Sequence, residues 1–189
     1  MRIIAGKYRS RILKSLKGLA LRPTSDRLRE TLFNILGPAV AGSRFLDVFA
    51  GTGAVGIEAL SRGAAHVTFL ENHAPAAKLI RQNLDSLEIT TGYTNLAADA
   101  LTALQKLAAQ HTPSAPGFDF VFVDPPYAAH VDYARTLEFL ATANFLASDA
   151  LVIFEHHHKF QLPEQFDRLR RARILKQGDA ALSFFRLTA

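Results

Sequence analysis

The sequence predicts an α/β fold, a Rossmann-like sheet of mostly parallel strands with helices on both faces. Apolar runs of strand length alternate with helix-length segments from Phe45 to Glu155, which is typical of strand–helix–strand units with right-handed crossovers. A glycine-rich turn at residues 51–56 follows the first of these runs and leads into a helix, as in nucleotide-binding α/β proteins. Two further apolar runs near the end of the chain can form a closing hairpin with one antiparallel strand in the sheet.

Residues 1–41 are predicted to form a basic extension, and residues 42–189 the main domain. Two short strands around Gly6-Lys7 are expected to pair as a hairpin. A helix is expected to begin near Asp26, because Thr24 or Ser25 can cap it and Asp26 suits the positive end of the helix dipole. Leucine and isoleucine at residues 28, 32, 35 and 36 recur at helical spacing, and Gly37-Pro38 ends the pattern.

In the main domain, strands are identified by β-branched and aromatic residues, and helices by apolar spacing between Gly, Pro and Ser. Strands are expected at residues 44–50, 66–71, 93–98, 118–123 and 150–155. Helices are expected at 57–61, 75–87, 100–109, 133–141 and, as a short one, 163–169. Residues 171–176 and 182–188 are expected to form the closing hairpin.

Composition excludes several classes of protein. With 189 residues, 49% of them apolar, one main domain with a sizeable core is expected. The absence of cysteine excludes disulfides and thiolate metal sites. There is no uncharged apolar run long enough to span a membrane, and the N-terminus lacks the apolar segment of a signal peptide. A cytoplasmic location is therefore expected.

Positive charge is concentrated at the start of the chain. Nine of the 22 Lys and Arg residues lie within residues 1–33, together with only two acidic residues. The rest of the chain holds 13 basic and 15 acidic residues and is nearly neutral. A basic arm on a near-neutral domain is typical of nucleic-acid binding; the alternative is a solvated tail that adds solubility.

The stretch Asp124-Pro125-Pro126-Tyr127 follows the most continuous apolar run, residues 118–123. The prolines end this strand because they cannot donate to a sheet ladder. Carboxylate and carbonyl acceptors therefore lie beside an aromatic ring at the carboxyl end of a strand, where open α/β sheets bind ligands. This arrangement suits an exocyclic NH2 group whose base stacks on Tyr127, although a plain strand-ending turn would give the same tetrapeptide.

The glycine turn leaves two cofactors open. Gly51, Gly53 and Gly56 match the dinucleotide fingerprint, and Glu71 lies where an acid that binds ribose belongs; both NAD and S-adenosylmethionine fit these features. Asp47 favours S-adenosylmethionine, because an acid just before the turn suits an ammonium group better than a pyrophosphate. Asp99, at the end of the third strand, is placed to accept from an adenine amine.

Together these motifs resemble a class I S-adenosylmethionine-dependent methyltransferase that acts on exocyclic amines. The segments at residues 2–6 and 22–34, which include Arg-Pro-Thr and Arg-Glu-x-Leu-Phe-Asn, are similar to those of the bacterial 16S rRNA (guanine-966-N2) methyltransferase family. The resemblance covers nearly the whole chain. It implies a seven-stranded sheet, and methyl transfer to the N2 amine of one guanine in 16S ribosomal RNA, in or near the assembled small subunit. We expect the enzyme to be a monomer.

The resemblance also implies roles for residues of this chain. Asp124 and Pro125 would orient the amine, and Tyr127 would stack on the guanine. The residues expected to bind S-adenosylmethionine are Asp47, Phe49, Ala50, Gly51, Gly53, Glu71, Asn72, Asp99 and Ala100. Those expected to contact RNA are Arg2, Lys7, Tyr8, Arg9, Arg11, Arg22 and Arg27.

Other functions remain open at this point. Asp-Pro-Pro-Tyr also suits an adenine-N6 methyltransferase on DNA or RNA, and a non-catalytic RNA-binding assembly factor could keep the cofactor fold. A dehydrogenase is a more distant alternative. The His156–His158 triplet is not expected to bind a metal, and Arg168, Arg170, Arg171 and Arg173 form a second basic cluster that either extends the RNA surface or lies on an exposed turn.

Overall fold

The computed structural model describes residues 1–15 and 25–188. The backbone groups into two compact units, Met1–Asp99 and Ala100–Ala189. The predicted boundary between residues 41 and 42 falls within the first unit and stays a prediction. No helix among the described residues is both long enough and apolar enough to cross a membrane.

The N-terminal arm folds back on itself as expected, although it forms no regular strands in the described part. Arg2 and Ile12 make an isolated antiparallel bridge, and the Ile3 backbone bonds to Ser10 and Arg11. Helix α1 (Asp26–Leu36) then begins at Ser25, whose side chain accepts from the Leu28 N–H at 3.1 Å. Gly37, with φ of 59°, ends this helix and starts the short 3-10 helix η1 (Gly37–Val40).

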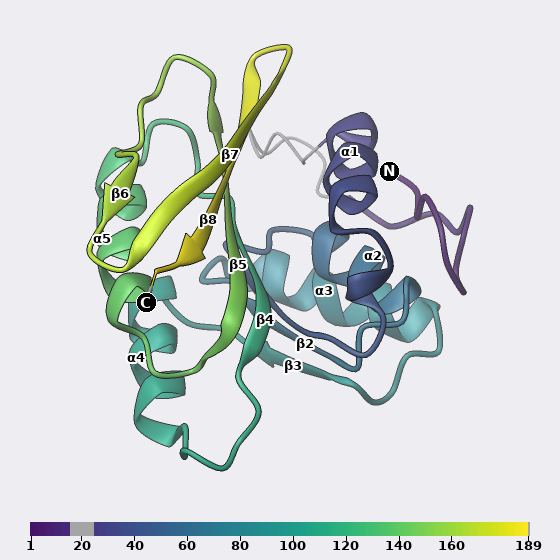
Figure 1. Ribbon diagram of the computed structural model, residues 1–189. Coiled ribbons are helices and arrows are strands. Elements are labelled where there is room, and N and C mark those ends of the chain that lie inside the picture. The colour runs from purple at the N-terminus through teal and green to yellow at the C-terminus, as the bar shows by residue number, and fades with distance from the viewer. Residues whose placement is uncertain (16–24, 189) are drawn as a thin grey trace. The chain divides into compact units, whose positions relative to one another are not determined.

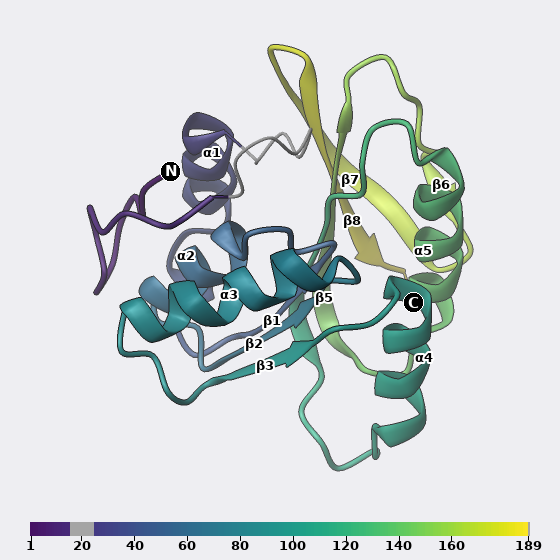
Figure 2. The ribbon, with the colours of Figure 1, turned by 180° about the vertical axis from the view of Figure 1, so that it is seen from behind.

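The first unit contains a parallel three-stranded sheet in the order β3-β2-β1. Helices α2 and α3 connect the strands and lie side by side over the sheet (Figure 2). A Cβ atom at Gly56 would lie 2.2 Å from the Phe69 ring, so only glycine lets α2 approach β2 this closely. The bounds are β1 (Arg44–Val48), α2 (Ala54–Ser61), β2 (His66–Leu70), α3 (Ala74–Ser86) and β3 (Tyr93–Leu96).

The second unit contains five strands in the order β4-β5-β8-β7-β6, with only the β4–β5 pair parallel. Helices α4 and α5 lie side by side against this sheet (Figure 1). The Tyr133 ring of α5 lies 6.5 Å from that of Phe154, which in turn lies 5.8 Å from Phe185. The bounds are α4 (Ala100–Gln110), β4 (Phe118–Val123), α5 (His130–Thr142), β5 (Leu146–His157), β6 (Gln165–Phe166), β7 (Leu169–Gln177) and β8 (Ala180–Leu187).

The predicted α/β class with an antiparallel closing hairpin is confirmed. The short helix predicted at residues 163–169 is wrong, because Phe166 pairs with Leu169 in a tight hairpin between β6 and β7. Asp167 in this turn has a φ of 49°, which a right-handed helix does not allow. The described residues therefore form eight strands rather than seven.

Candidate active site

The glycine loop lies in the first unit, between β1 and α2. Phe49, Gly51 and Gly53 have φ values of 63°, 55° and 77°. Positive φ is unusual for a bulky residue such as Phe49, and such strain clusters at ligand-binding sites. Nothing lies within 4 Å of the position of a Cβ on Gly51, so the loop backbone is open on that side. The Ala50 N–H holds the loop to β2 by donating to the Leu70 carbonyl at 3.0 Å.

Asp47 lies at the base of this loop and is only 2% exposed. Its Oδ2 accepts from the Gly56 N–H at 2.9 Å, which braces the first turn of α2. Burial, with a smaller contribution from the negative charge of Glu71, raises the pKa of Asp47 to about 8. Burial therefore favours the neutral form of Asp47 in the free protein, whereas a bound ammonium group would favour its carboxylate. The predicted contact of Asp47 with an ammonium group stays a prediction.

Glu71 follows β2 and links the loop to the next helix. Its Oε2 accepts from the Gly51 N–H at 2.7 Å and its Oε1 from the His73 N–H at 2.8 Å. A carboxylate has further lone pairs, so Glu71 can still accept from ligand hydroxyls. Hydrogen bonds thus bring Glu71 and the glycine loop together. Of the other predicted cofactor residues, Asn72 and Asp99 are exposed near the ends of β2 and β3. Ala100 begins α4 in the second unit.

The Asp124–Tyr127 stretch lies in the second unit at the carboxyl end of β4, which ends at Val123 as predicted. Asp124 is half-buried and Pro125 is buried. The Tyr133 hydroxyl lies 3.1 Å from the Pro125 carbonyl oxygen and 3.0 Å from that of Glu155. A hydroxyl has one proton, so it donates to one of the two at a time. Tyr133 thereby ties the Pro125 peptide to the end of β5.

The surroundings of these residues are aromatic and acidic. Burial first, and then the negative charge of Asp124, raises the pKa of Tyr133, so its hydroxyl stays protonated and donates. The Tyr127 hydroxyl donates to Glu155 Oε1 at 3.5 Å. The Tyr127 ring meets the His157 ring edge to face, with centroids 5.7 Å apart.

Sequence reasoning did not assign Tyr133, Glu155 or His157 to the site. Glu155 and His157 could have been found, because they lie at the carboxyl end of β5, the parallel neighbour of β4. Tyr133 had no such signal, since it looks like an ordinary residue of the apolar face of α5. Its hydroxyl is recognised only by its distance from Pro125.

The basic arm is fixed to the first unit, which argues against a loose solubilising tail. Glu58 on α2 is fully buried, and its carboxylate accepts from the N–H groups of Ile4 at 2.8 Å and Ala5 at 3.0 Å. It also pairs with Arg62 at 2.8 Å and with Arg29 at 3.7 Å. Ile4 and Ala5 are thereby held by a charged group, which makes the stronger kind of hydrogen bond.

Two further contacts hold the arm. A Cβ at Gly6 would lie 1.9 Å from the Ser61 carbonyl oxygen, so the arm can approach α2 only through glycine. The Asn83 amide of α3 bonds to both backbone groups of Lys14 and donates to the Thr52 carbonyl in the glycine loop at 3.1 Å. The arm and the glycine loop therefore share one anchoring residue, Asn83.

The contacts that hold the arm to α2 and α3 leave most of its predicted RNA-contacting side chains accessible to solvent. Tyr8 is half-buried, with Lys7 Nζ 5.2 Å from its ring centroid. Arg29, which also lies on α1, is fully buried and pairs with Asp26 and Glu58, so it cannot contact phosphates. Arg22 lies outside the described residues. The exposed basic side chains are Arg2, Lys7, Arg9, Arg11 and Arg27.

The three histidines of the triplet lie in two different environments. His156 is buried, and its Nε2 lies 2.9 Å from the Ser183 hydroxyl. Burial lowers the pKa of His156, so the ring is neutral. His157 and His158 stack at 4.6 Å, and their nitrogens lie within 4.8 Å of a carboxylate oxygen of Asp179. The expectation that the triplet binds no metal stays a prediction.

Comparisons with known proteins agree with the motifs. The chain is 36% identical to the putative rRNA methyltransferase YlbH of Bacillus subtilis, over 98% of both chains. It is 38% identical to the ribosomal RNA small subunit methyltransferase D of Escherichia coli, over 86% of this chain and 78% of that protein. A solved structure of a putative methyltransferase from Escherichia coli matches with a TM-score of 0.83 and 33% identity, covering 100% of this chain and 98% of the other.

The protein family described as "conserved hypothetical protein 95" matches residues 1–186. This range includes the arm, the glycine loop, the Asp124–Tyr127 stretch and the closing hairpin. The chain therefore belongs to this family, the class I methyltransferase family that its motifs resemble.

Proposed function

We propose that this protein transfers a methyl group from S-adenosylmethionine to the N2 amine of one guanine in 16S ribosomal RNA. The broader assignment, a methyltransferase for ribosomal RNA of the small subunit, rests on the family and on the names of its relatives. The choice of guanine N2 rests on the resemblance of the motifs and on the chemistry of the Asp124–Tyr127 stretch. We further propose that the enzyme acts as a monomer on the small subunit or an assembly intermediate.

One observation carries the proposal: the Pro125 carbonyl lies 3.1 Å from the Tyr133 hydroxyl, and the negative charge of Asp124 is close enough to raise the pKa of the same hydroxyl. The Tyr133 hydroxyl holds the Pro125 oxygen, which keeps a second lone pair for another donor. Two acceptors next to each other match the two N–H groups of an exocyclic amine. Tyr127, half-buried and braced by Glu155, offers a ring on which the base can stack.

The first unit fits S-adenosylmethionine. The loop is open at Gly51, where a ligand can approach the backbone closely, and the acceptors of Glu71 suit ribose hydroxyls. Asp99 would accept from the adenine amine, and Asp47 with the loop backbone would hold the methionine end. When bound, the cofactor supplies a methyl group already activated by its sulfonium.

Because the methyl is activated, the protein mainly has to position the amine. The guanine N2 lone pair is delocalised into the ring and is a poor nucleophile. Hydrogen bonds to Asp124 and Pro125 would turn the amine so that its lone pair faces the methyl group. As the N–C bond forms, the C–S bond would break and S-adenosylhomocysteine would leave, and Asp124 would take the proton that the methylated amine loses. Alignment and preorganised acceptors of this kind can lower a barrier by several kcal/mol or more, on the order of 7 to 11 in well-aligned cases.

The experiment is to incubate the protein with labelled S-adenosylmethionine and unmethylated small subunits or naked 16S RNA, and to identify the nucleoside by mass spectrometry. We expect N2-methylguanosine. N6-methyladenosine would instead make the protein an adenine methyltransferase. Tight RNA binding without turnover on either substrate would indicate a non-catalytic assembly factor and overturn the proposal.

A further inference from the structure

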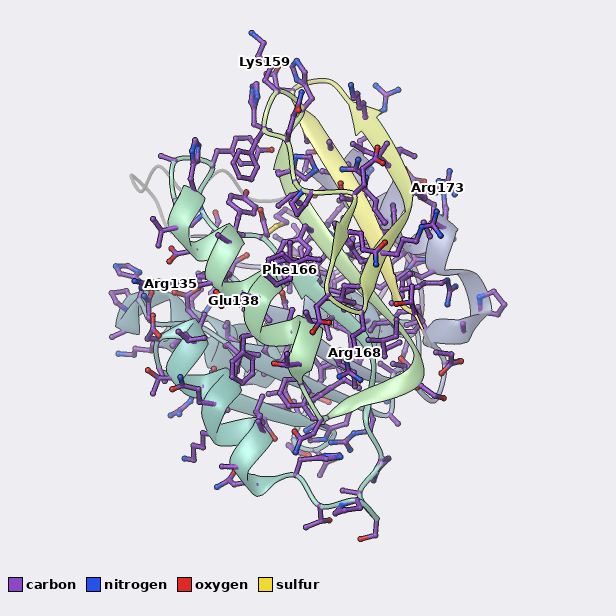
Figure 3. All side chains as sticks on the ribbon, turned by 60° about the vertical axis from the view of Figure 1, so that its left-hand side comes forward. Arg135, Glu138, Lys159, Phe166, Arg168 and Arg173 are labelled. Carbon is purple, nitrogen blue, oxygen red and sulfur yellow. The ribbon has the colours of Figure 1, made fainter. Side chains whose placement is uncertain are left out.

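The closing hairpin separates the second basic cluster into arginines that support the fold and arginines that do not. Arg168 donates to the carbonyl oxygens of Ala141 and Ala143, near the end of α5 (Figure 3). Arg171 donates to the Leu162 carbonyl at 3.1 Å and lies 3.5 Å from the Glu164 carboxylate. Arg168 and Arg171 therefore hold backbone that would otherwise lack partners, and neither is free for a ligand.

Arg170 and Arg173 remain, and the register of the sheet adds Arg186. Arg170 pairs with Arg186 of β8, and Arg173 pairs with Phe184, two residues from Arg186. Side chains of paired residues lie on the same face, and residues two apart on a strand share a face. The register shift between Arg171 and Arg173 is what returns Arg173 to the face of Arg170. All three side chains are exposed.

These three residues, here called the arginine face, carry charge that the described part of the fold does not neutralise. None of them forms an ion pair with a described residue, and Arg186 donates only to the Asp149 carbonyl oxygen, at 3.2 Å. Like charges directly opposite each other on adjacent strands destabilise a sheet. The Arg170–Arg186 pair therefore costs stability in the free protein.

Protection of a sheet edge does not account for this arrangement. Charged residues on an edge strand do prevent pairing with other chains, and Arg173 could serve in that way. Arg186 cannot, because β8 pairs with β5 on one side and β7 on the other. An arginine on an interior strand, facing a second arginine, points instead to a ligand with closely spaced negative charges.

We propose that the arginine face binds phosphates of the substrate RNA on one side of the target base. This proposal rests on the proposed function. Residue Ala180 of β8 pairs with His157, at the sheet edge where Asp124 lies, and Arg186 is six residues further along the strand. At about 3.3 Å per residue this is about 20 Å, or the rise of about six stacked nucleotides. An RNA strand that runs from the target base along the direction of β8 would thus reach all three side chains.

The test compares two double variants that remove the same charge. Arg170→Gln/Arg173→Gln changes the arginine face, and Lys106→Gln/Arg135→Gln removes two exposed cations from α4 and α5 (Figure 3 shows Arg135). Binding to unmethylated 16S RNA transcripts is measured by filter binding between 50 and 200 mM salt. Two lost phosphate contacts should weaken binding about 25- to 60-fold at 0.1 M salt and lower the salt slope by about 1.4 to 1.8. The control should bind within about twofold of wild type.

Melting temperature and methylation kinetics make the result decisive. Arg170→Gln alone should leave the melting temperature unchanged or raise it by about 1 to 3 °C, because it relieves the like-charge pair. Methylation by the arginine-face variant should show a raised KM for RNA, with kcat and cofactor binding unchanged. Wild-type binding by the variant with an unaltered salt slope would overturn this inference alone. Failure of the wild-type protein to bind or methylate 16S RNA would overturn both this inference and the proposed function.

Discussion

Tyr133→Phe tests how the Pro125 carbonyl is positioned, because it removes one oxygen atom from a buried site and changes little else. The Tyr133 side chain is 1% exposed, and its hydroxyl lies 3.1 Å from the Pro125 oxygen and 3.0 Å from the Glu155 oxygen. Phenylalanine fills the same space and keeps the ring contacts with Phe154 and Phe160. Only the hydrogen bond is lost.

The expected effects follow from that loss. A buried carbonyl that loses its donor costs about 1 to 3 kcal/mol, so the melting temperature of a chain of this length should fall by about 2 to 12 °C. A Pro125 peptide that is free to shift aims the amine poorly, and a displacement of about 1 Å can slow a reaction about 100-fold. We expect kcat for methylation to fall about 10- to 100-fold, while binding of S-adenosylhomocysteine is unchanged.

The assay is single-turnover methylation of 16S RNA, with cofactor binding followed by calorimetry. Tyr93→Phe is the matched control, because the Tyr93 hydroxyl forms no hydrogen bond with the described residues, and it should behave as wild type. A Tyr133→Phe enzyme that loses the expected stability yet keeps the wild-type kcat would refute the reasoning, since Pro125 would then need no fixed position.

Three other changes test the rest of the site. The pKa of Asp47 is raised to about 8, so the folded protein keeps a proton that the unfolded chain loses above about pH 4. The free energy of unfolding should therefore fall as pH rises from about 4 to 8, by up to about 1.4 kcal/mol per pH unit. Asp47→Asn should remove this fall when unfolding is measured in urea. Glu58→Gln removes the charge and one of the two acceptor oxygens that hold the arm, so hydrogen exchange at Ile4 and Ala5 should rise about 10- to 100-fold, with Glu30→Gln as an unaffected control. Glu71→Gln should weaken S-adenosylhomocysteine binding about 10- to 100-fold in calorimetry, and unchanged binding would remove Glu71 from the site.

Local patterns in the sequence were sufficient to predict most elements of the fold. The cap at Ser25, the stop at Gly37 and both ends of β4 are confirmed, because each depends on residues close together in the chain. The Asp124–Tyr127 stretch was placed at a strand end for the same reason: prolines stop a ladder whatever surrounds them. The helix predicted at residues 163–169 is wrong because this short segment turns at Asp167 and pairs with itself as a tight hairpin.

Features that depend on distant residues could not be predicted. Glu58 is separated from Ile4 by 54 residues, and no periodicity shows that it holds the arm. Arg29 resembles a phosphate ligand on a basic helix, yet it is buried against Glu58. Of the four arginines in the second cluster, only the register of β7 and β8 shows which two point to solvent next to Arg186.

The central claim is that Asp124 aims the base amine, and Asp124→Asn tests it most directly. Asparagine keeps the shape of the side chain but replaces one acceptor with an NH2 group, which cannot accept from the amine. Methyl transfer to 16S RNA should fall at least about 100-fold while calorimetry shows unchanged binding of S-adenosylhomocysteine, and the wild-type product should be N2-methylguanosine. An Asp124→Asn enzyme that methylates as fast as wild type would contradict the account.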